Sequence, residues 1–236
     1  MGYYPIFVEM AGRRVLLVGG GHVALEKIGK LVDAGAQVTV VSPELIPPVR
    51  EYIEDGRAEW RQRPYERGDV AGVEMVMVAT DDGEVNATVA AEARAAGIWV
   101  NAADDVDNCD FILPSLAQRG TIAIASSTGG TSPALARWLR EQMEAFLTAD
   151  VVALGDPLAE VRVLARARDR ECAAVCDRVR TPPPLLCDSC PNRISPDDWQ
   201  AAIDDELRAL LRHGEYDRAR GRLVRALGID RPLVRA

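Results

Sequence analysis

The sequence predicts an α/β protein built on a doubly wound parallel sheet, and three observations support this prediction. Short apolar runs alternate with helical segments from residue 13 to about residue 114. The first of these runs ends in a glycine-rich turn. After residue 114 the pattern changes to a pair of short strands followed by helical, charged sequence. Strand–helix alternation favours a parallel sheet that binds ligands at the carboxyl ends of its strands.

The glycine turn follows the first predicted strand, at residues 14–18, and opens a helix. Gly19, Gly21 and Ala24 fit the pattern Gly-x-Gly-x-x-Gly/Ala. The first glycine permits the tight turn, the second lets a pyrophosphate approach the backbone, and the small third residue lets the helix pack on the strand. This context favours a Rossmann-type dinucleotide site. The alternative is a glycine turn that only joins strand to helix.

The other elements of the sheet are marked by short apolar runs and by turn residues. A glycine at residue 35 follows the first helix at the position expected after a helix end. The run 74–80 is apolar enough to be buried on both faces of a sheet. The predicted strands are 38–41, 58–61, 74–80 and 99–103, and an alanine-rich helix is predicted at 86–96.

The second half of the chain is expected to begin with a β-hairpin. Its two strands are predicted at 111–114 and 121–126. Ser132 and Pro133 then begin a helix that runs to about Leu147. Helical sequence continues to about residue 180, prolines at 182–184 interrupt it, and two more helices are expected after residues 195–198 and at 216–227.

Composition and charge exclude several classes of protein. The formal net charge of −8 argues against a nucleic-acid surface. No apolar run approaches the roughly 18 residues that a membrane helix needs, and the N-terminal residues do not resemble an export signal. The five cysteines, an odd number, suggest reduced thiols and therefore a cytoplasmic protein.

The loops after the second and fourth strands supply candidate cofactor contacts. Ser42 could bond a ribose hydroxyl, while Glu44 comes two residues late and could simply begin a helix. No arginine stands there to bind a 2′-phosphate, which favours NAD over NADP. Thr80 closes the fourth strand and is the better cofactor contact in its loop, whereas Asp82 is expected to cap the next helix.

Two further segments could carry substrate chemistry. Asp104 directly follows the fifth strand, where a carboxylate could accept a proton as a hydride leaves. An Asx-turn or a helix cap is the alternative role for it. The loop 126–133 is rich in hydroxyls and glycines and leads into a helix N-terminus, which suits anions. Arg137 and Arg140 follow on that helix and could pair with substrate carboxylates.

Taken together, these motifs resemble the precorrin-2 dehydrogenase family, which includes the bifunctional sirohaem synthase of yeast. The resemblance covers residues 3 to about 147. It rests on Pro5–Phe7, on the stretches 18–24 and 79–86, on Asn101–Asp104, on 111–115 and on 129–137. It implies an NAD-binding Rossmann domain at 1–114, a dimerisation segment at 115–150 and a C-terminal helical domain at 151–236 of a homodimer.

The resemblance also implies a reaction and its residues. The reaction is NAD-dependent oxidation of precorrin-2 to sirohydrochlorin, which some members follow by inserting Fe²⁺ to give sirohaem. The essential aspartate of the family falls on Asp104. The implied cofactor contacts are Gly19, Gly21, His22, Val23, Ser42, Pro43, Glu44, Thr80 and Asn101. The candidate contacts to the carboxylate-rich tetrapyrrole are Ser127, Thr128, Gly129, Thr131, Ser132, Arg119, Arg137 and Arg140. Thr128 stands where the family often has serine.

Two alternative functions stay open from the sequence. The chain could be a non-catalytic NAD-binding regulatory domain, but that role needs neither Asp104 nor a second anion-binding loop. It could also be a chelatase that has lost the dehydrogenase step. With two histidines, His22 and His213, the chain cannot form a multi-histidine metal cage, so any iron would be held by the macrocycle.

Four cysteines lie beyond the region of resemblance. Cys172 and Cys176 are separated by three residues, and Cys187 and Cys190 by two. Such spacing could form a four-thiolate zinc or iron–sulfur site. Unligated cysteines in a helical domain are the alternative.

Overall fold

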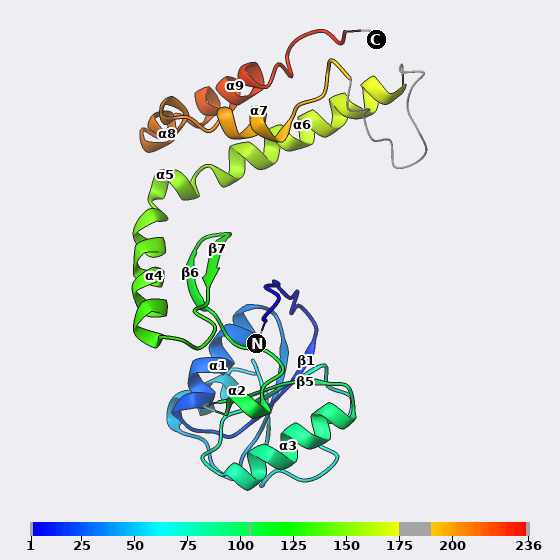
Figure 1. Cartoon of the computed structure of the whole chain (residues 1–236), viewed down its shortest axis with the longest axis vertical. Helices are drawn as coiled ribbons and strands as arrows, with labels where there is room; N and C mark the ends of the chain where they lie inside the picture. The colour runs from blue at the N-terminus through cyan, green and yellow to red at the C-terminus, as the bar shows by residue number, and fades with distance from the viewer. Residues whose placement is uncertain (1, 104, 175–189, 235–236) are drawn as a thin grey trace. The chain divides into compact units, whose positions relative to one another are not determined.

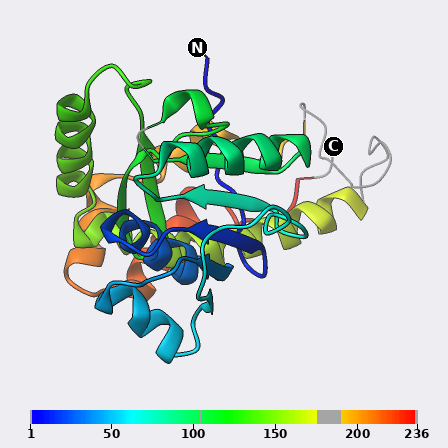
Figure 2. The same cartoon turned by 90° about the horizontal axis from the view of Figure 1, so that it is seen from below.

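A computed structural model of the chain describes residues 2–103, 105–174 and 190–234. The chain divides into two compact units, Met1–Leu113 and Pro114–Ala236. Figures 1 and 2 show the elements of both units, which we describe one at a time. The finer division at residue 150 stays a prediction.

The first unit contains a five-stranded sheet in the order β3-β2-β1-β4-β5, and every neighbouring pair of strands is parallel. This confirms the predicted doubly wound fold. Strand order reverses at β1, so the loops after β1 and β4 flank the point where such sheets bind ligands. The elements are β1 (Arg14–Val18), α1 (His22–Asp33), β2 (Gln37–Val41), α2 (Pro47–Glu54), β3 (Glu59–Arg61), β4 (Met75–Val78), α3 (Gly83–Ala95), β5 (Trp99–Ala102) and the 3₁₀ turn η1 (Val106–Asn108).

Helices cover both faces of this sheet. Residues of α1 and α2, including Ile28 and Val49, pack with Leu17 of β1 on one face. Residues of α3, including Val89, pack with Leu16 on the opposite face. Alternate residues of β1 therefore enter two different cores, as the pleat of a strand requires. Burial on both faces explains why the central strands read as continuous apolar runs.

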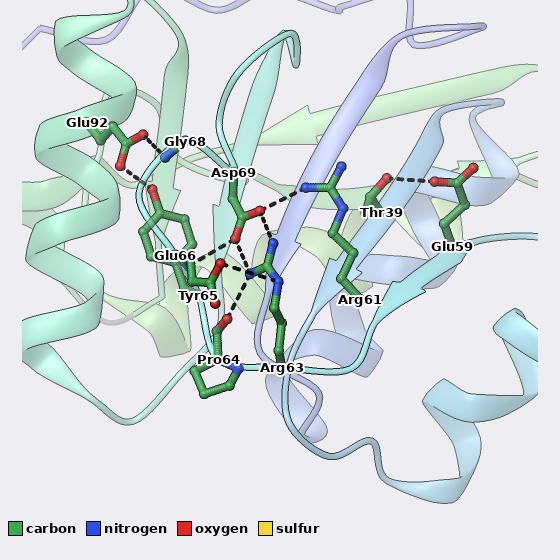
Figure 3. Close-up of polar contacts among 10 residues, drawn as sticks. All are labelled: Thr39, Glu59, Arg61, Arg63, Pro64, Tyr65, Glu66, Gly68, Asp69 and Glu92. Atoms are coloured by element: carbon green, nitrogen blue, oxygen red, sulfur yellow. Dashed lines mark hydrogen bonds and ion pairs between the residues drawn. The ribbon is translucent and has the colours of Figure 1, made fainter.

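A polar cluster holds the edge of the sheet near β3 (Figure 3). Asp69, whose side chain is 4% exposed, accepts hydrogen bonds from Arg63 (2.6 and 2.7 Å) and Arg61 (2.9 Å). The backbone N–H of Glu66 adds a bond of 3.0 Å to the same carboxylate. The hydrogen bond from Arg63 is the main reason that the pKa of Asp69 falls to about 2. We call these residues, with Tyr65 and Glu92, the Asp69 cluster.

Tyr65 and Glu92 connect this cluster to α3. The hydroxyl of Tyr65 donates to Glu92 at 2.7 Å, and the backbone N–H of Gly68 donates to the same carboxylate at 2.6 Å. Burial, together with the neighbouring carboxylate, raises the pKa of Tyr65. The cluster thus ties the loop between β3 and β4 to both the sheet and α3.

The second unit begins with an antiparallel hairpin and continues as helices. The elements are β6 (Ser115–Arg119), β7 (Ile122–Ser126), α4 (Pro133–Phe146), α5 (Ala149–Val152), α6 (Gly155–Ala174), α7 (Pro196–Ala201), α8 (Asp205–Arg212) and α9 (Tyr216–Ala226). Leu154, Val161, Leu207 and Leu223 form the core of its helical part. Among the described helices, none is long and apolar enough to cross a membrane.

A second clamped carboxylate lies in this unit. Asp150, 6% exposed, accepts hydrogen bonds from Arg208 (3.0 Å) and Arg212 (2.8 Å) of α8. The hydroxyl of Thr148 donates to it at 2.6 Å and is the main reason that its pKa falls to about 2. The clamp fixes α5 against α8.

Several predictions of local structure are corrected. The expected hairpin strand at 111–114 is wrong: β6 begins at Ser115, because the N–H of Asp110 bonds the carbonyl of Val100 and Phe111 accepts from Asn101. Residues 110–111 are therefore tied to β5 rather than to β7. A helix beginning at Glu44 was left open, and α2 instead begins at Pro47; α8 had no separate counterpart in the prediction, whereas the caps at Ser132 and Ser195 are confirmed. The predicted break at 182–184 lies outside the described residues.

Candidate functional site

The glycine turn between β1 and α1 is built for close approach. Gly19 has φ +112, and a Cβ there would lie 2.3 Å from the carbonyl oxygen of Ala79. Only glycine fits this position. At Gly21, in contrast, φ is −92 and a Cβ would meet nothing within 4 Å. Gly21 is thus not needed by the fold, and the space above it is open to a ligand.

The N-terminus of α1 is left without a side-chain cap. Gly21 occupies the N-cap position, and the first turn contains no acidic residue. The initial N–H groups of a helix need acceptors, and the helix dipole favours an anion there. A pyrophosphate can satisfy both requirements. His22 is exposed and Val23 half-buried in this first turn, where the prediction places them.

The loop after β2 closes against the glycine turn. The N–H of Gly19 bonds the carbonyl of Val41, and the N–H of Ile46 bonds that of Gly20. Ser42 is 7% exposed, and its hydroxyl donates to the carbonyl of Glu44 at 2.7 Å. The loop thus uses the Ser42 hydroxyl internally, while Pro43 and Glu44 are exposed beside the turn.

The loop after β4 lies on the other side of the turn. A Cβ on Gly19 would lie 3.3 Å from the Cγ2 of Thr80, which places Thr80 beside the glycines. The hydroxyl of Thr80 donates to Asn86 of α3 at 2.6 Å. Asp82 accepts from the N–H groups of Glu84 and Val85, which confirms its predicted role as the cap of α3. The structure thus brings Gly19, Gly21, Ser42, Glu44 and Thr80 to one edge of the sheet.

A buried lysine that the sequence analysis missed stands next to this edge. Lys27 of α1 is 8% exposed, and its Nζ donates to Oδ1 of Asn101 in β5 at 3.0 Å. Burying an ammonium group is costly unless it is bonded. The position of Lys27 in the sequence could have predicted this burial, because Lys27 shares a helix face with Ala24, Ile28 and Leu31, which are all buried. A lysine on such a face indicates a buried charge.

Asn101 connects this lysine to the segment after β5. Its Nδ2 donates to the carbonyl of Phe111 at 2.9 Å and lies 3.5 Å from the Sγ of Cys109. Asn101 is 6% exposed, so its side-chain amide makes bonds inside the protein and is not available at the surface. Cys109 donates to the carbonyls of Ala102 (3.0 Å) and Asp105 (3.2 Å), and burial raises its pKa. Asp104 itself lies outside the described residues.

The predicted anion loop of the second unit bonds mainly to itself. The N–H of Gly129 donates to Ser127 at 3.0 Å, and Thr128 exchanges hydrogen bonds with the backbone of Ser132. Ser132 caps α4 by accepting from Leu135 at 3.2 Å. These are the contacts of an elaborate helix cap. Thr131 is exposed in the same loop.

The three candidate arginines already have partners within their unit. Arg137 pairs with Glu141 at 3.0 Å and Arg140 with Glu144 at 2.6 Å, each one turn further along α4. Exposed pairs of this kind contribute only about 0.3–0.5 kcal/mol, so a substrate carboxylate can displace the glutamate. Arg119 donates instead to the carbonyl of Leu147 at 2.8 Å, a contact that holds β6 to the end of α4.

Of the four C-terminal cysteines, the structure describes two. Cys172 and Cys190 are both buried, and their sulfur atoms lie 3.4 Å apart. Cys176 and Cys187 lie outside the described residues. Within the described ranges, no group of three or more Cys, His, Asp or Glu side chains could hold a metal ion.

Four features together define a Rossmann protein of the NAD(P)-binding class. The sheet is parallel, the turn requires glycine at position 19, Gly21 leaves open space, and α1 begins without a side-chain cap. The residues present fit a dinucleotide, because the helix N-terminus lacks an anion of its own and Gly21 leaves room for one.

The comparisons with known proteins show which families parts of the chain resemble. Residues 6–115 match the family described as NAD(P)-binding, and residues 119–145 match "Sirohaem biosynthesis protein central". The resemblance inferred from the motifs is therefore confirmed: the first 145 residues of the chain are similar to part of the sirohaem synthases.

The relatives are larger proteins. Siroheme synthase 3 of Aeromonas hydrophila is 42% identical over 168 residues, which are 71% of this chain and 36% of that protein. Siroheme synthase of Tolumonas auensis is 45% identical over 162 residues, 69% of this chain and 34% of that protein. The chain thus spans about a third of the length of these relatives. Among solved structures, SirC, precorrin-2 dehydrogenase, matches with a TM-score of 0.67 and 24% identity, covering 93% of this chain and 99% of that one, which shows the shared fold.

Proposed function

We propose that this protein oxidises precorrin-2 to sirohydrochlorin with NAD in the biosynthesis of sirohaem. The observation that carries the proposal is the uncapped glycine turn in a chain whose relatives are sirohaem synthases. When bound, the dinucleotide accepts the hydride that this oxidation removes. The N–H groups at the start of α1 bind its pyrophosphate, and the loops at Glu44 and Thr80 enclose it from two sides.

Three features support NAD rather than NADP. The loop after β2 presents Glu44, whose charge repels a 2′-phosphate. Arg61 is on the neighbouring strand β3, but Asp69 holds its guanidinium group at 2.9 Å. Arg63 is held by the same carboxylate. Both arginines are therefore kept within the Asp69 cluster.

Asp104 is the proposed acid/base residue. The oxidation removes a hydride and a proton, and a carboxylate directly after β5 can take that proton. Lys27 and Asn101 fix the carboxyl end of β5, from which Asp104 follows. Arg137 and Arg140, with the hydroxyls of the 127–132 loop, are proposed to bind the carboxylates of the tetrapyrrole.

The proposal includes a homodimer in the cytoplasm. On α4, Leu135, Trp138 and Phe146 are 46%, 54% and 63% exposed. Large apolar side chains exposed on one short helix favour contact with a second copy. Size-exclusion chromatography with light scattering tests this, and a Trp138→Glu variant that stays dimeric contradicts the role of α4.

A chelatase step is the second part of the proposal. Insertion of Fe²⁺ releases pyrrole protons, and Asp104 could accept them as it accepts the proton of the oxidation. Fe²⁺ is here a substrate that the macrocycle nitrogens hold. Sirohydrochlorin and Fe²⁺ supplied without NAD test this step separately from the oxidation.

The decisive test mixes the full chain with precorrin-2 and NAD and follows the absorbance of sirohydrochlorin and NADH. We expect one NADH for each sirohydrochlorin formed and a preference for NAD over NADP. Product formation no faster than without the protein contradicts the dehydrogenase and leaves two alternatives, a nucleotide sensor and a chelatase. NAD binding without either reaction identifies the sensor.

A further inference from the structure

A groove in the second unit lies between α6 and the segment 193–203, which contains α7, and uses none of the residues proposed for the reaction. Its volume is about 750 Å³, within the range of about 300–1,000 Å³ that small-molecule sites have. The α6 residues that line it recur every three or four positions from Gly155 to Asp169, so they share one face of the helix. The α7 helix lies beside α6 in Figure 1.

Apolar side chains line much of this groove. Leu158 on α6 and Ile194 and Trp199 on the opposite wall are partly buried and pack against the core of the helical part. Ile203 also lines the groove and is 40% exposed. Apolar side chains that line an open groove favour a ligand with a large apolar surface, and an indole ring packs well against a flat one.

The charged side chains of the groove are mainly arginines. Arg162 and Arg166 are exposed one turn apart on the groove face of α6, and Arg193 lines the opposite wall. Within the part of the chain that the structure describes, no carboxylate forms an ion pair with Arg162 or Arg166. Arginines of α8 and α9, in contrast, pair with carboxylates, as do Arg208, Arg212, Arg218, Arg220 and Arg222.

One carboxylate lines the groove as well. Asp169 lies at the end of the α6 wall, and burial raises its pKa, although the neighbouring Arg168 opposes this rise. Arginines therefore outnumber carboxylates in the groove of a chain whose formal net charge is −8. Such a groove is complementary to a ligand that carries several carboxylates on an apolar body.

We propose that this groove binds a flat tetrapyrrole with several carboxylates, the class to which the product of the proposed reaction belongs. The apolar side chains contact the macrocycle, and Arg162 and Arg166 pair with two of its carboxylates. The choice of a tetrapyrrole rests on the proposed function. A site of this kind would keep the oxidised macrocycle on the protein after NADH leaves.

Titration with uroporphyrin, a stable flat tetrapyrrole with carboxylates around its rim, tests this proposal without NAD and without turnover. The full chain is used with Arg137→Gln and Arg140→Gln, because these changes remove the arginines proposed for the substrate. We expect uroporphyrin to bind this variant, and the further changes Arg162→Gln and Arg166→Gln to weaken binding by about tenfold or more. Arg225→Gln, at an exposed position of α9 outside the groove, is the matched control and should not weaken binding.

Hydrogen exchange of the unmutated chain keeps the proposal testable if these variants fail to fold. Uroporphyrin should slow amide exchange in the segments 155–169 and 193–203. Three results would overturn the proposal: no slowing in these segments, equal binding with and without the two groove arginines, or displacement of uroporphyrin by an equal concentration of a polyglutamate peptide, which would identify an acidic peptide as the ligand. A chain that binds uroporphyrin in the groove but forms no sirohydrochlorin contradicts the proposed function and not this site.

Discussion

At Asp69, two guanidinium groups and a backbone N–H surround one carboxylate that is 4% exposed (Figure 3). The start of α1, which follows β1 of the same sheet, differs: no described side chain caps its first turn, and that turn contains no acidic residue. The first region satisfies its charges internally and therefore contributes to stability. The second leaves donors and space available and therefore suits a ligand. Changes in the two regions should separate stability from activity.

The largest expected effect is on catalysis at Asp104. Asp104→Asn keeps the size of the side chain but cannot accept a proton at neutral pH. We expect kcat to fall by about a hundred- to ten-thousandfold while the KM for NAD stays near its original value. Stopped-flow absorbance measures it. An unchanged kcat would remove Asp104 from the mechanism.

Lys27 should affect both activity and stability, because it is a buried charge whose hydrogen bond holds Asn101 of β5. Lys27→Met leaves Oδ1 of Asn101 without its donor and loosens the carboxyl end of β5. We expect kcat to fall about ten- to a hundredfold, as small misplacements of catalytic groups do, with partial recovery in Lys27→Arg. Lys30→Met, at an exposed position of the same helix, is the control. Equal kcat values in Lys27→Met and Lys30→Met would contradict this role.

The Asp69 cluster should contribute stability that depends on pH. Because the folded pKa of Asp69 lies near 2 and the unfolded value near about 3.9, its contribution is complete above about pH 5. It is lost as the pH falls toward 2. We expect Asp69→Asn to lower the free energy of unfolding by about 2 kcal/mol at pH 7 and to approach the original protein near pH 2.

Urea unfolding at a series of pH values measures this effect. Asp150→Asn is the matched variant in the second unit, where the pKa is also about 2. A difference between Asp69→Asn and the original protein that is the same at pH 7 and pH 2 would contradict the assigned pKa.

The smallest effect is expected at the surface arginines of α4. Arg137→Gln and Arg140→Gln remove exposed pairs and should leave the melting temperature unchanged. We expect the KM for precorrin-2 to rise by about three- to tenfold for each. Arg170→Gln, at an exposed position of α6, is the control. Equal KM values in the three variants would exclude Arg137 and Arg140 from substrate binding.

Local signals in the sequence predicted much of the fold. The glycine pattern, the caps at Asp82 and Ser132 and the apolar runs of the central strands depend on neighbouring residues, so they can be predicted without tertiary structure. For α2 the sequence left open a helix that begins at Glu44; the helix begins at Pro47 instead, because proline is tolerated in a first helical turn.

The parts that were not predicted depend on contacts between distant segments. The hairpin begins later than expected because residues 110–111 are hydrogen-bonded to Val100 and Asn101 of β5 and therefore do not pair with β7. Lys27 bonds a partner 74 positions away, and this bond uses the Asn101 side chain that the sequence predicts as a cofactor contact. The pairing of Cys172 with Cys190 is likewise tertiary.

The most direct test of the account compares Gly21→Asp with Asp69→Asn by titration with NAD and by thermal unfolding. An aspartate at Gly21 has room and can cap α1, but it places a carboxylate where the pyrophosphate should bind. We predict that Gly21→Asp weakens NAD binding about a hundredfold with an equal or higher melting temperature. Asp69→Asn should lower the melting temperature and bind NAD normally. Unchanged NAD affinity in Gly21→Asp would contradict the account.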